Sequence, residues 1–399
     1  MDNCQLPKGY KNTEVGVIPE DWDVKPLFEI GDIATGTTPP TNNKSNYGED
    51  YFFVSPADLG KGKYIVDTEK KLSKLGFSIA RKYPANSILF TCIGSTIGKA
   101  GIAKIELTSN QQINAVFPNE SYSSDFLFYY LNFISPKIKM GASEQAVPMI
   151  NKTEFGKTSI ALPTKAEQTA IATALSDTDA LINSLEKLIA KKRNIKQGAM
   201  QQLLKPKEGW EVKKLGDLIT YKNGKSFESF IDENGEYYLI TLNSIDIKGE
   251  LKKEHLRVKE FDNSLEKGDL VMVLSDVAHG NFLGLTDVIP ENNKYVLNQR
   301  MGALKNLRGV TSRFLSIYIN HFQSYFKLSG KGSSQQNLGK DDILKFEIHL
   351  PSLDEQNEIS TILSDMDAEI QALETKLEKY RKIKLGMMQN LLTGKIRLV

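Results

Sequence analysis

The stretch LPTKAEQTAIATALSDTDALINSLEKLIAKKRNIKQGAMQQLL, residues 162–204, returns without a gap as LPSLDEQNEISTILSDMDAEIQALETKLEKYRKIKLGMMQNLL, residues 350–392. About half of the aligned positions are identical, and such an internal repeat outweighs any single motif as evidence on the fold. Residue 162 corresponds to residue 350, an offset of 188 residues. A period this long is too large for a solenoid repeat and indicates two tandem copies of one domain-sized unit.

The same offset holds outside the stretch. Matching positions include Trp22/Trp210, Asp58/Asp246, Asn110/Asn298, Gln111/Gln299, Phe126/Phe314 and Tyr130/Tyr318. Between these anchors the two copies differ strongly. Each unit is therefore predicted to be a variable globular half followed by a similar helical half.

Each repeated stretch is predicted to form one long helix. Apolar residues follow steps of three and four, which is the seam of a coiled coil. The stripe consists of Ile171, Leu175, Ile182, Leu185 and Ile189 in the first copy and Ile359, Leu363, Met366, Ile370, Leu373 and Leu377 in the second. Because a narrow apolar stripe must be buried, we expect the two helices to pair antiparallel within the chain. A parallel homodimer is the alternative.

The globular halves, residues 16–162 and 207–350, read as mixed α and β, which gives an α+β fold class. Short β-rich runs such as residues 51–54, 88–90 and 270–274 are bounded by Gly, Pro, Asn and Asp. Helices are expected over residues 124–134 and 312–326. The predicted loops are rich in Lys, Asn, Gln, Ser and Thr, the side chains that contact phosphates and base edges, although polar loops are common in any protein.

Composition excludes several classes of protein. Lys+Arg total 51 and Asp+Glu 49, so the chain as a whole is not strongly basic. Residues 41–104 hold ten basic and five acidic side chains, a local excess that suits phosphate contact or an ordinary solvated surface. No apolar run is long enough to span a bilayer. The two cysteines, Cys4 and Cys92, are far apart, which fits a reducing cytoplasm.

No catalytic set is evident. Residues 94–100 resemble a phosphate loop but are one residue short and end in Ala100. The four histidines, at 255, 279, 321 and 349, are scattered and indicate no metal site. These observations favour a non-catalytic binding or scaffold protein.

Taken together, the doubled architecture, the opening residues 10–24, the Leu-Pro…Glu-Gln start of each helix and its Gly-x-Met-Gln-x-Leu-Leu end resemble the specificity subunit of type I restriction-modification systems. The resemblance implies target-recognition domains at residues 1–163 and 207–351 and helical spacers at 164–206 and 352–399. It implies a chain that reads a bipartite double-stranded DNA site, one half-site per domain.

It also implies partners. Two methyltransferase (modification) subunits would dock on the helices, and motor-nuclease (restriction) subunits would join them. The chain itself would bind no cofactor, while S-adenosylmethionine, ATP and magnesium would belong to the partner subunits.

The repeat separates predicted scaffold residues from candidate DNA contacts. Because the two halves should read different sequences, residues identical at the offset are predicted to be scaffold, and base readers are expected among the loop residues that differ. The candidates are Thr38, Asn42, Asn43, Lys44, Ser95, Lys99 and Gln145 in the first half and Lys222, Lys225, Ser226, His279, Asn281, Ser334, Gln335 and Gln336 in the second.

The sequence leaves two other hypotheses open. One is a coiled-coil adaptor whose globular halves bind protein or carbohydrate. The other is a specificity subunit of a methylation-only system that has no nuclease. DNA binding would fall steeply with salt because of counterion release, which separates the first hypothesis from DNA recognition.

Overall fold

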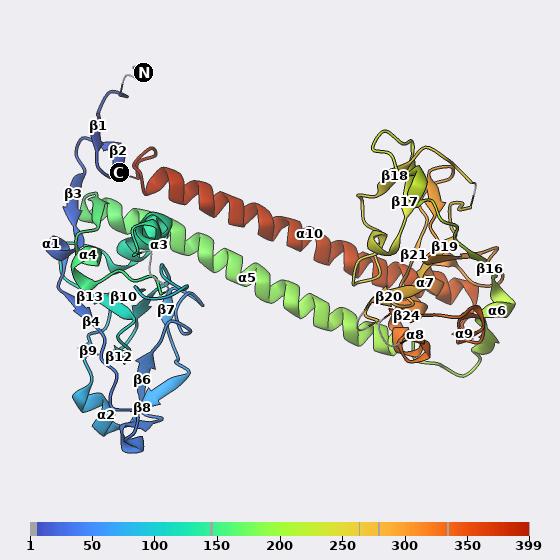
Figure 1. The fold of residues 1–399 in the computed structure, drawn as a ribbon, viewed down its shortest axis with the longest axis horizontal. Coiled ribbons are helices and arrows are strands. Elements are labelled where there is room, and N and C mark those ends of the chain that lie inside the picture. The colour runs from blue at the N-terminus through green and yellow to red at the C-terminus, as the bar shows by residue number, and fades with distance from the viewer. Residues whose placement is uncertain (1–5, 144–146, 263, 278–279, 333–334, 399) are drawn as a thin grey trace. The chain divides into compact units, whose positions relative to one another are not determined.

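The protein is described by a computed structural model that covers residues 6–143, 147–262, 264–277, 280–332 and 335–398. It divides into two compact units (Figure 1). Unit 1 contains residues 1–187 and 375–399, and unit 2 contains residues 188–374. Each unit therefore holds one globular half and a part of both long helices. No helix among the described residues is long and apolar enough to cross a membrane.

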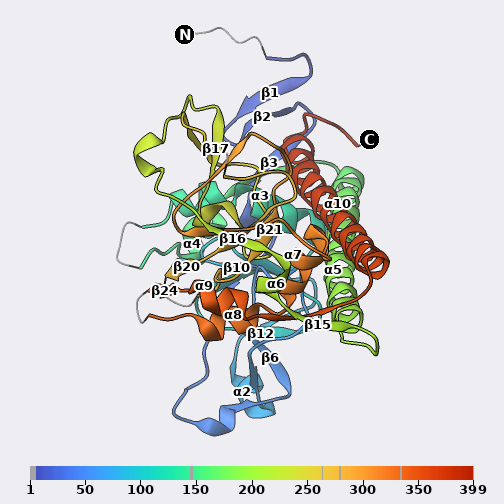
Figure 2. The same ribbon diagram turned by 90° about the vertical axis from the view of Figure 1, so that its right-hand side faces the viewer.

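Unit 1 contains two five-stranded sheets and two short strand pairs. The sheets have strand orders β4-β13-β10-β11-β7 and β5-β8-β6-β12-β9, and the pairs are β1-β2 and β14-β3. Both views place the second sheet on the side of the first that faces away from α3 (Figures 1 and 2). The elements are β1 (Tyr10–Thr13), β2 (Gly16–Pro19), β3 (Asp23–Pro26), α1 (Leu27–Ile30), β4 (Ile33–Thr35), η1 (Lys44–Asn46), β5 (Tyr47–Gly48), β6 (Tyr51–Val54), β7 (Tyr64–Ile65), β8 (Lys70–Leu72), α2 (Lys74–Ile79), β9 (Lys82–Tyr83), β10 (Ile88–Thr91), β11 (Ala100–Ala103), β12 (Leu107–Ser109), β13 (Ile113–Val116), α3 (Ser124–Met140), α4 (Lys152–Gly156) and β14 (Ser159–Leu162).

Unit 2 repeats this plan with smaller sheets. Its strand orders are β16-β23-β19-β21 and β18-β17-β22, with the pairs β15-β25 and β20-β24. The elements are β15 (Glu211–Lys214), α6 (Leu215–Leu218), β16 (Thr220–Asn223), η2 (Glu228–Phe230), β17 (Tyr237–Ile240), η3 (Leu242–Ser244), β18 (Leu256–Val258), β19 (Leu270–Val273), β20 (Ser275–Val277), β21 (Thr286–Val288), β22 (Tyr295–Leu297), β23 (Met301–Lys305), α7 (Ser312–His321), α8 (Gln323–Ser329), β24 (Gln335–Asn337), α9 (Lys340–Leu344) and β25 (Glu347–Leu350). Strands β3 and β14 match β15 and β25 at the 188-residue offset. The predicted internal repeat and α+β class are confirmed.

The two long helices, α5 (Lys165–Leu203) and α10 (Leu353–Leu391), are both 39 residues long. In unit 1 they run antiparallel, since Asp179 pairs with Lys384 at 2.6 Å and Glu186 pairs with Arg381 at 2.6 Å. As the residue number rises along one helix, it falls along the other.

The same two ion pairs recur in unit 2. Asp367 pairs with Lys196, and Glu374 pairs with Arg193, at positions displaced by the repeat offset from those in unit 1. The two helices are therefore antiparallel in each unit.

The predicted seam residues lie on the packed side of the helices. Ile171 and Leu175 belong to the apolar core of unit 1, and Ile359 and Leu363 belong to that of unit 2. The seam residues nearest each helix start therefore also pack against the apolar core of the globular half. The nine buried members are Ile171, Leu175, Ile182, Leu185, Ile189, Ile359, Leu363, Ile370 and Leu377, while Met366 and Leu373 are half-buried.

In unit 1, Glu167 and Gln168 near the start of α5 join this helix to the globular half. Trp22 Nε1 donates to the buried Glu167 carboxylate at 3.1 Å. Gln168 accepts the Ser123 backbone N–H at 2.8 Å and donates to the Pro163 carbonyl at 2.9 Å. A buried polar group costs little only when it is hydrogen-bonded, so both side chains fix the domain on its helix.

Unit 2 repeats the junction. Trp210 Nε1 donates to Glu355 at 3.2 Å, and Gln356 accepts the Thr311 N–H at 2.9 Å. Gln356 also donates to the Pro351 carbonyl at 3.0 Å. The motif that reveals the repeat in the sequence is therefore the joint between helix and domain.

Candidate nucleic-acid interface

Three loops of unit 1 gather at one end of the first sheet. β4 and β10 end there and β11 and β13 begin there, because the neighbouring strands pair antiparallel. The connecting residues 36–46, 92–99 and 110–112 are here called loop cluster 1. The Thr38 hydroxyl hydrogen-bonds the Gln111 side chain, which joins two of these loops directly.

Unit 2 has an equivalent end. β16 and β19 end and β21 and β23 begin on one side of the four-stranded sheet. Loop cluster 2 is defined as residues 224–228, 274–277, 280–285, 298–300 and 335–337. Strand β24 joins it because β20 pairs with β24, with Asp276 opposite Gln336.

Most of the candidate residues of unit 1 lie in loop cluster 1 with exposed side chains. Asn43 is engaged within its own turn, where its side-chain oxygen accepts the Ser45 backbone N–H at 3.2 Å. The Lys99 side chain packs beside Gly60. Gln145 lies outside the described residues. The exposed candidates are Thr38, Asn42, Asn43, Lys44, Ser95 and Lys99.

The candidates of unit 2 are more varied. Lys222 lies within β16, opposite Ala303, and is half-buried, so the sheet holds it directly before the loop. His279 and Ser334 lie outside the described residues. The exposed candidates are Lys225, Ser226 and Asn281, and the half-buried ones are Gln335 and Gln336 on β24.

Exposed cations surround the long loop of cluster 1. Arg81 donates its backbone N–H to the Thr37 hydroxyl at 2.7 Å, which places it against this loop. Lys44 is the first residue of η1 and Lys74 is the first residue of α2, and these two helices pack against each other. All three side chains are exposed. Such a rim can offset phosphate charge without reading sequence.

Other cations of the basic stretch are neutralised locally. Lys63 pairs with Asp125 at 3.0 Å, and Lys71 pairs with Asp67 at 3.0 Å. The hydrogen bond from Lys71 holds the pKa of Asp67 below its ordinary value. The local charge excess seen in the sequence is therefore only partly available to a ligand.

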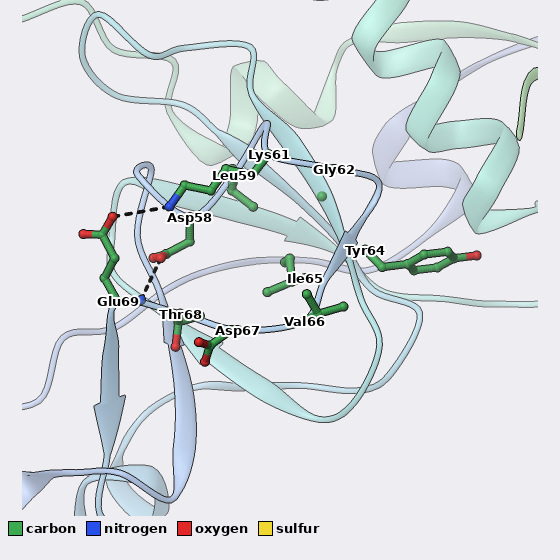
Figure 3. A pocket seen from close by; sticks show the side chains of 11 residues that line it. Asp58, Leu59, Lys61, Gly62, Tyr64, Ile65, Val66, Asp67, Thr68 and Glu69 are labelled. Carbon is green, nitrogen blue, oxygen red and sulfur yellow. Dashed lines mark hydrogen bonds and ion pairs between the residues drawn. The ribbon is translucent and has the colours of Figure 1, made fainter. Parts of the chain in front are cut away.

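A pocket at the β7 edge of the first sheet of unit 1 is lined by carboxylates instead (Figure 3). The Asp58 carboxylate accepts the Ser55 N–H at 2.8 Å and the Glu69 N–H at 2.9 Å, so it organises the loop that lines the pocket. Its counterpart Asp246 accepts the backbone N–H groups of Lys248 and Glu250. These matched aspartates are loop-building residues.

The described residues offer little catalytic chemistry. They contain no group of three or more His, Cys, Asp or Glu side chains placed to hold a metal ion. Burial raises the pKa of the Cys92 thiol to about 12, so the thiol stays protonated and is a poor nucleophile.

Their match at the repeat offset predicts that Gln111 and Gln299 belong to the scaffold. Trp22, Phe126 and Phe314 of that group are buried. Gln111 and Gln299, however, are exposed at the tips of short turns within the two loop clusters. The signal that separates them from the buried matches is their position between two β-rich runs, where a turn tip faces solvent.

Family comparison adds an independent observation. The model of the type I restriction modification DNA specificity domain matches residues 19–197 and again residues 207–381. The chain belongs to this family. The second match begins 188 residues after the first, so the specificity domain occurs twice at the offset of the repeat.

Two relatives align with this chain over nearly the full length of both proteins. The type I restriction enzyme MjaIX specificity subunit of Methanocaldococcus jannaschii is 25% identical, covering 97% of this chain and 96% of its own length. The MjaVIII specificity subunit of the same organism is 26% identical over 95% of this chain and 94% of its own length.

A crystal structure of a type I restriction-modification S subunit from M. genitalium has the same fold. Its TM-score is 0.59 at 16% identity, and the match covers 93% of this chain and 96% of that one. At this identity the likeness concerns the fold.

Proposed function

We propose that this chain is the DNA-recognition subunit of a type I restriction-modification complex and reads a bipartite site with one half-site per globular domain. The observation that carries the proposal is the pair of loop clusters. Each stands at the same end of an equivalent sheet, yet their side chains differ. Equivalent scaffolds with different polar loops are what a reader of two unlike half-sites requires.

The partners follow from the same proposal. Two methyltransferase subunits would dock on α5 and α10 and supply S-adenosylmethionine chemistry. Motor-nuclease subunits would supply the ATP- and magnesium-dependent steps. Supporting this division of labour, the full-length relatives are named as specificity subunits. Affinity purification of the full chain should therefore recover a methyltransferase in a two-to-one ratio.

The first test is an adenine-methylation map, by long-read sequencing, of a host that expresses the chain with its neighbouring methyltransferase gene. The matched control lacks only the gene for this chain. A single split motif that depends on the chain would establish recognition and give both half-sites. Absence of any new motif, with both proteins co-purifying, would favour the adaptor hypothesis instead. Restriction of unmethylated DNA in the same host separates a full restriction system from a methylation-only one.

The helices are proposed to set the gap between the half-sites. Deleting one heptad around Glu186 and one around its partner Arg381 keeps the apolar seam in register. At 1.5 Å per residue, seven residues correspond to about 10.5 Å, or about three base pairs at 3.4 Å each. The methylated motif should keep both half-sites and lose about three base pairs from the gap. Altered half-site sequences would contradict the ruler model.

Salt dependence distinguishes DNA recognition from an adaptor function. The logarithm of the binding constant should fall linearly with the logarithm of salt concentration, with a slope set by the number of phosphates neutralised. Removing the cation of Arg81 or Lys74 should reduce that slope by about one per cation without changing the motif. A flat salt response would contradict the proposed role of the basic rim.

A further inference from the structure

We propose that Gln111 and Gln299 are matched, sequence-independent contacts to the DNA backbone, which place each domain on its half-site while other residues read the bases. The proposal rests on the function proposed above and adds a role that the differing loop residues cannot fill. Its starting point is that both side chains are exposed although they match at the repeat offset.

The turn that carries each glutamine is built in the same way in both units. In unit 1, Gly36 donates its N–H to the Ile113 carbonyl at 3.0 Å, and Ile113 donates to the Asn110 carbonyl at 3.3 Å. In unit 2, Gly224 donates to Met301 at 3.0 Å, and Met301 donates to Asn298 at 3.0 Å. All three positions, Gly36/Gly224, Ile113/Met301 and Asn110/Asn298, correspond at the 188-residue offset.

A close backbone approach locks these turns. A Cβ atom at Gly36 would lie 2.1 Å from the Asn110 carbonyl oxygen, and one at Gly224 would lie 2.0 Å from that of Asn298. Only glycine fits against the turn in each unit. On the other side of the turn, the Cys92 N–H donates to the Gln112 carbonyl at 2.8 Å in unit 1. The Leu274 N–H donates to the Arg300 carbonyl at 3.1 Å in unit 2. The glutamine at each tip therefore stands on a fixed backbone.

Each glutamine also lies beside a candidate reader loop. The Thr38 hydroxyl hydrogen-bonds the Gln111 side-chain oxygen, and Gln299 Nε2 is 3.4 Å from the Glu228 carboxylate. With its oxygen bound by Thr38, the carboxamide of Gln111 is oriented and presents its N–H donors. A phosphate oxygen accepts hydrogen bonds from such N–H groups.

The repeat decides between a phosphate and a base as the target. The two domains are proposed to read different half-sites, so a residue that is identical in type, position and backbone support should contact what all DNA shares. Sugar and phosphate meet this condition, whereas bidentate contact to one adenine would impose the same base on both halves. A neutral donor also binds phosphate without releasing counterions, so it adds affinity but no salt dependence.

The test measures dissociation constants by fluorescence anisotropy for the full chain in complex with its methyltransferase. The duplexes are the site given by the methylation map and variants with each base pair substituted. Gln111→Ala and Gln299→Ala should each weaken binding about tenfold on every duplex, with unchanged preference and unchanged salt slope. Gln111→Glu should weaken it further, because a carboxylate repels phosphate. The matched control is Asn12→Ala, an exposed carboxamide on β1.

The outcomes separate this inference from the function on which it rests. If the wild-type complex does not distinguish the mapped site from a scrambled duplex, the proposed function fails. If it does, but the glutamine variants bind like Asn12→Ala, only the backbone contact is refuted. Relaxed preference at one base pair would likewise refute it, by identifying a base contact. Unchanged thermal unfolding of each variant shows that the turn remains folded.

Discussion

Arg397 should stabilise unit 1 strongly, because it neutralises a fully buried carboxylate. The Glu167 side chain has 0% relative exposure, and it accepts hydrogen bonds from Arg397 Nε at 2.7 Å and Nη2 at 2.8 Å. Arg397 also pairs with Asp21 at 2.7 Å. Replacing Arg397 with alanine leaves Glu167 with the Trp22 indole N–H and one long backbone contact.

The magnitude follows from the burial of the two partners. Removing one partner of a buried ion pair costs about 3–5 kcal/mol. The Arg397 side chain is 26% exposed, so water can reach part of the vacated space and the lower end applies. We expect Arg397→Ala to lower the free energy of unfolding of unit 1 by about 3 kcal/mol, a large share of the about 5–15 kcal/mol typical of a domain. Arg397→Lys should recover only part of this, because an ammonium lacks the planar fork of donors.

Unit 2 supplies the matched control. Lys207 pairs with Glu355, the counterpart of Glu167, at 2.7 Å, but their side chains are 52% and 30% exposed. Lys207→Ala should therefore cost about 1 kcal/mol or less.

The two tryptophans allow each unit to be followed separately by fluorescence during urea unfolding. Trp22 reports unit 1 in a Trp210→Phe background, and Trp210 reports unit 2 in a Trp22→Phe background. Equal losses for Arg397→Ala and Lys207→Ala would refute the reasoning from burial.

Three further predictions concern acid stability and the helix–domain joint. Burial lowers the pKa values of His255 and His321 below 6.5, so their stabilising contribution is complete above pH 6.5 and is lost as pH falls through the depressed folded pKa values. Unit 2, monitored by Trp210 fluorescence, should therefore lose stability on mild acidification, and replacing both histidines with glutamine should flatten this loss. The hydrogen bond from Arg397 lowers the pKa of Asp21 below 3.8, so the stability that this pair contributes is complete above pH 3.8 and is lost as pH falls further. Asp21→Asn should remove this pH dependence from the urea midpoints of unit 1. Gln356→Leu should cost unit 2 about 1–2 kcal/mol by removing the acceptor for a backbone N–H, while leucine at the exposed Asn357 should stay within about 0.5 kcal/mol in the same assay.

The architecture could be predicted from the sequence because it depends on local features, namely the helical periodicity and the repeat offset. The seam of α5 and α10 follows from helical periodicity, and the offset predicted that equivalent elements would recur. The helix expected over residues 312–326 is instead two helices, α7 and α8, separated at Phe322. Composition could not show this break, since aromatic and aliphatic residues continue through it.

The candidate interface was less predictable, because long-range pairing builds it. Strand β24 reaches loop cluster 2 by pairing with β20, which lies about sixty residues earlier in the chain. No local pattern in the segment around Gln335 indicates this partner. Nor does composition distinguish an exposed loop cation from one such as Lys63, whose side chain is held by Asp125.

The repeat also explains how the two reading surfaces can differ without loss of the fold. In each unit the globular half is held by a joint that lies on the helix start, through the Trp–Glu and Gln–backbone contacts, while the loops stand at the free end of a sheet. Substitutions of the exposed side chains in those loops leave the joint, the sheet and the helix pair intact, since surface positions away from such features cost little stability. Changing Trp22 or Gln168, in contrast, would move every loop of its domain at once. We therefore expect changes of recognised sequence to arise from loop residues, and changes of the gap between half-sites to arise from the helices.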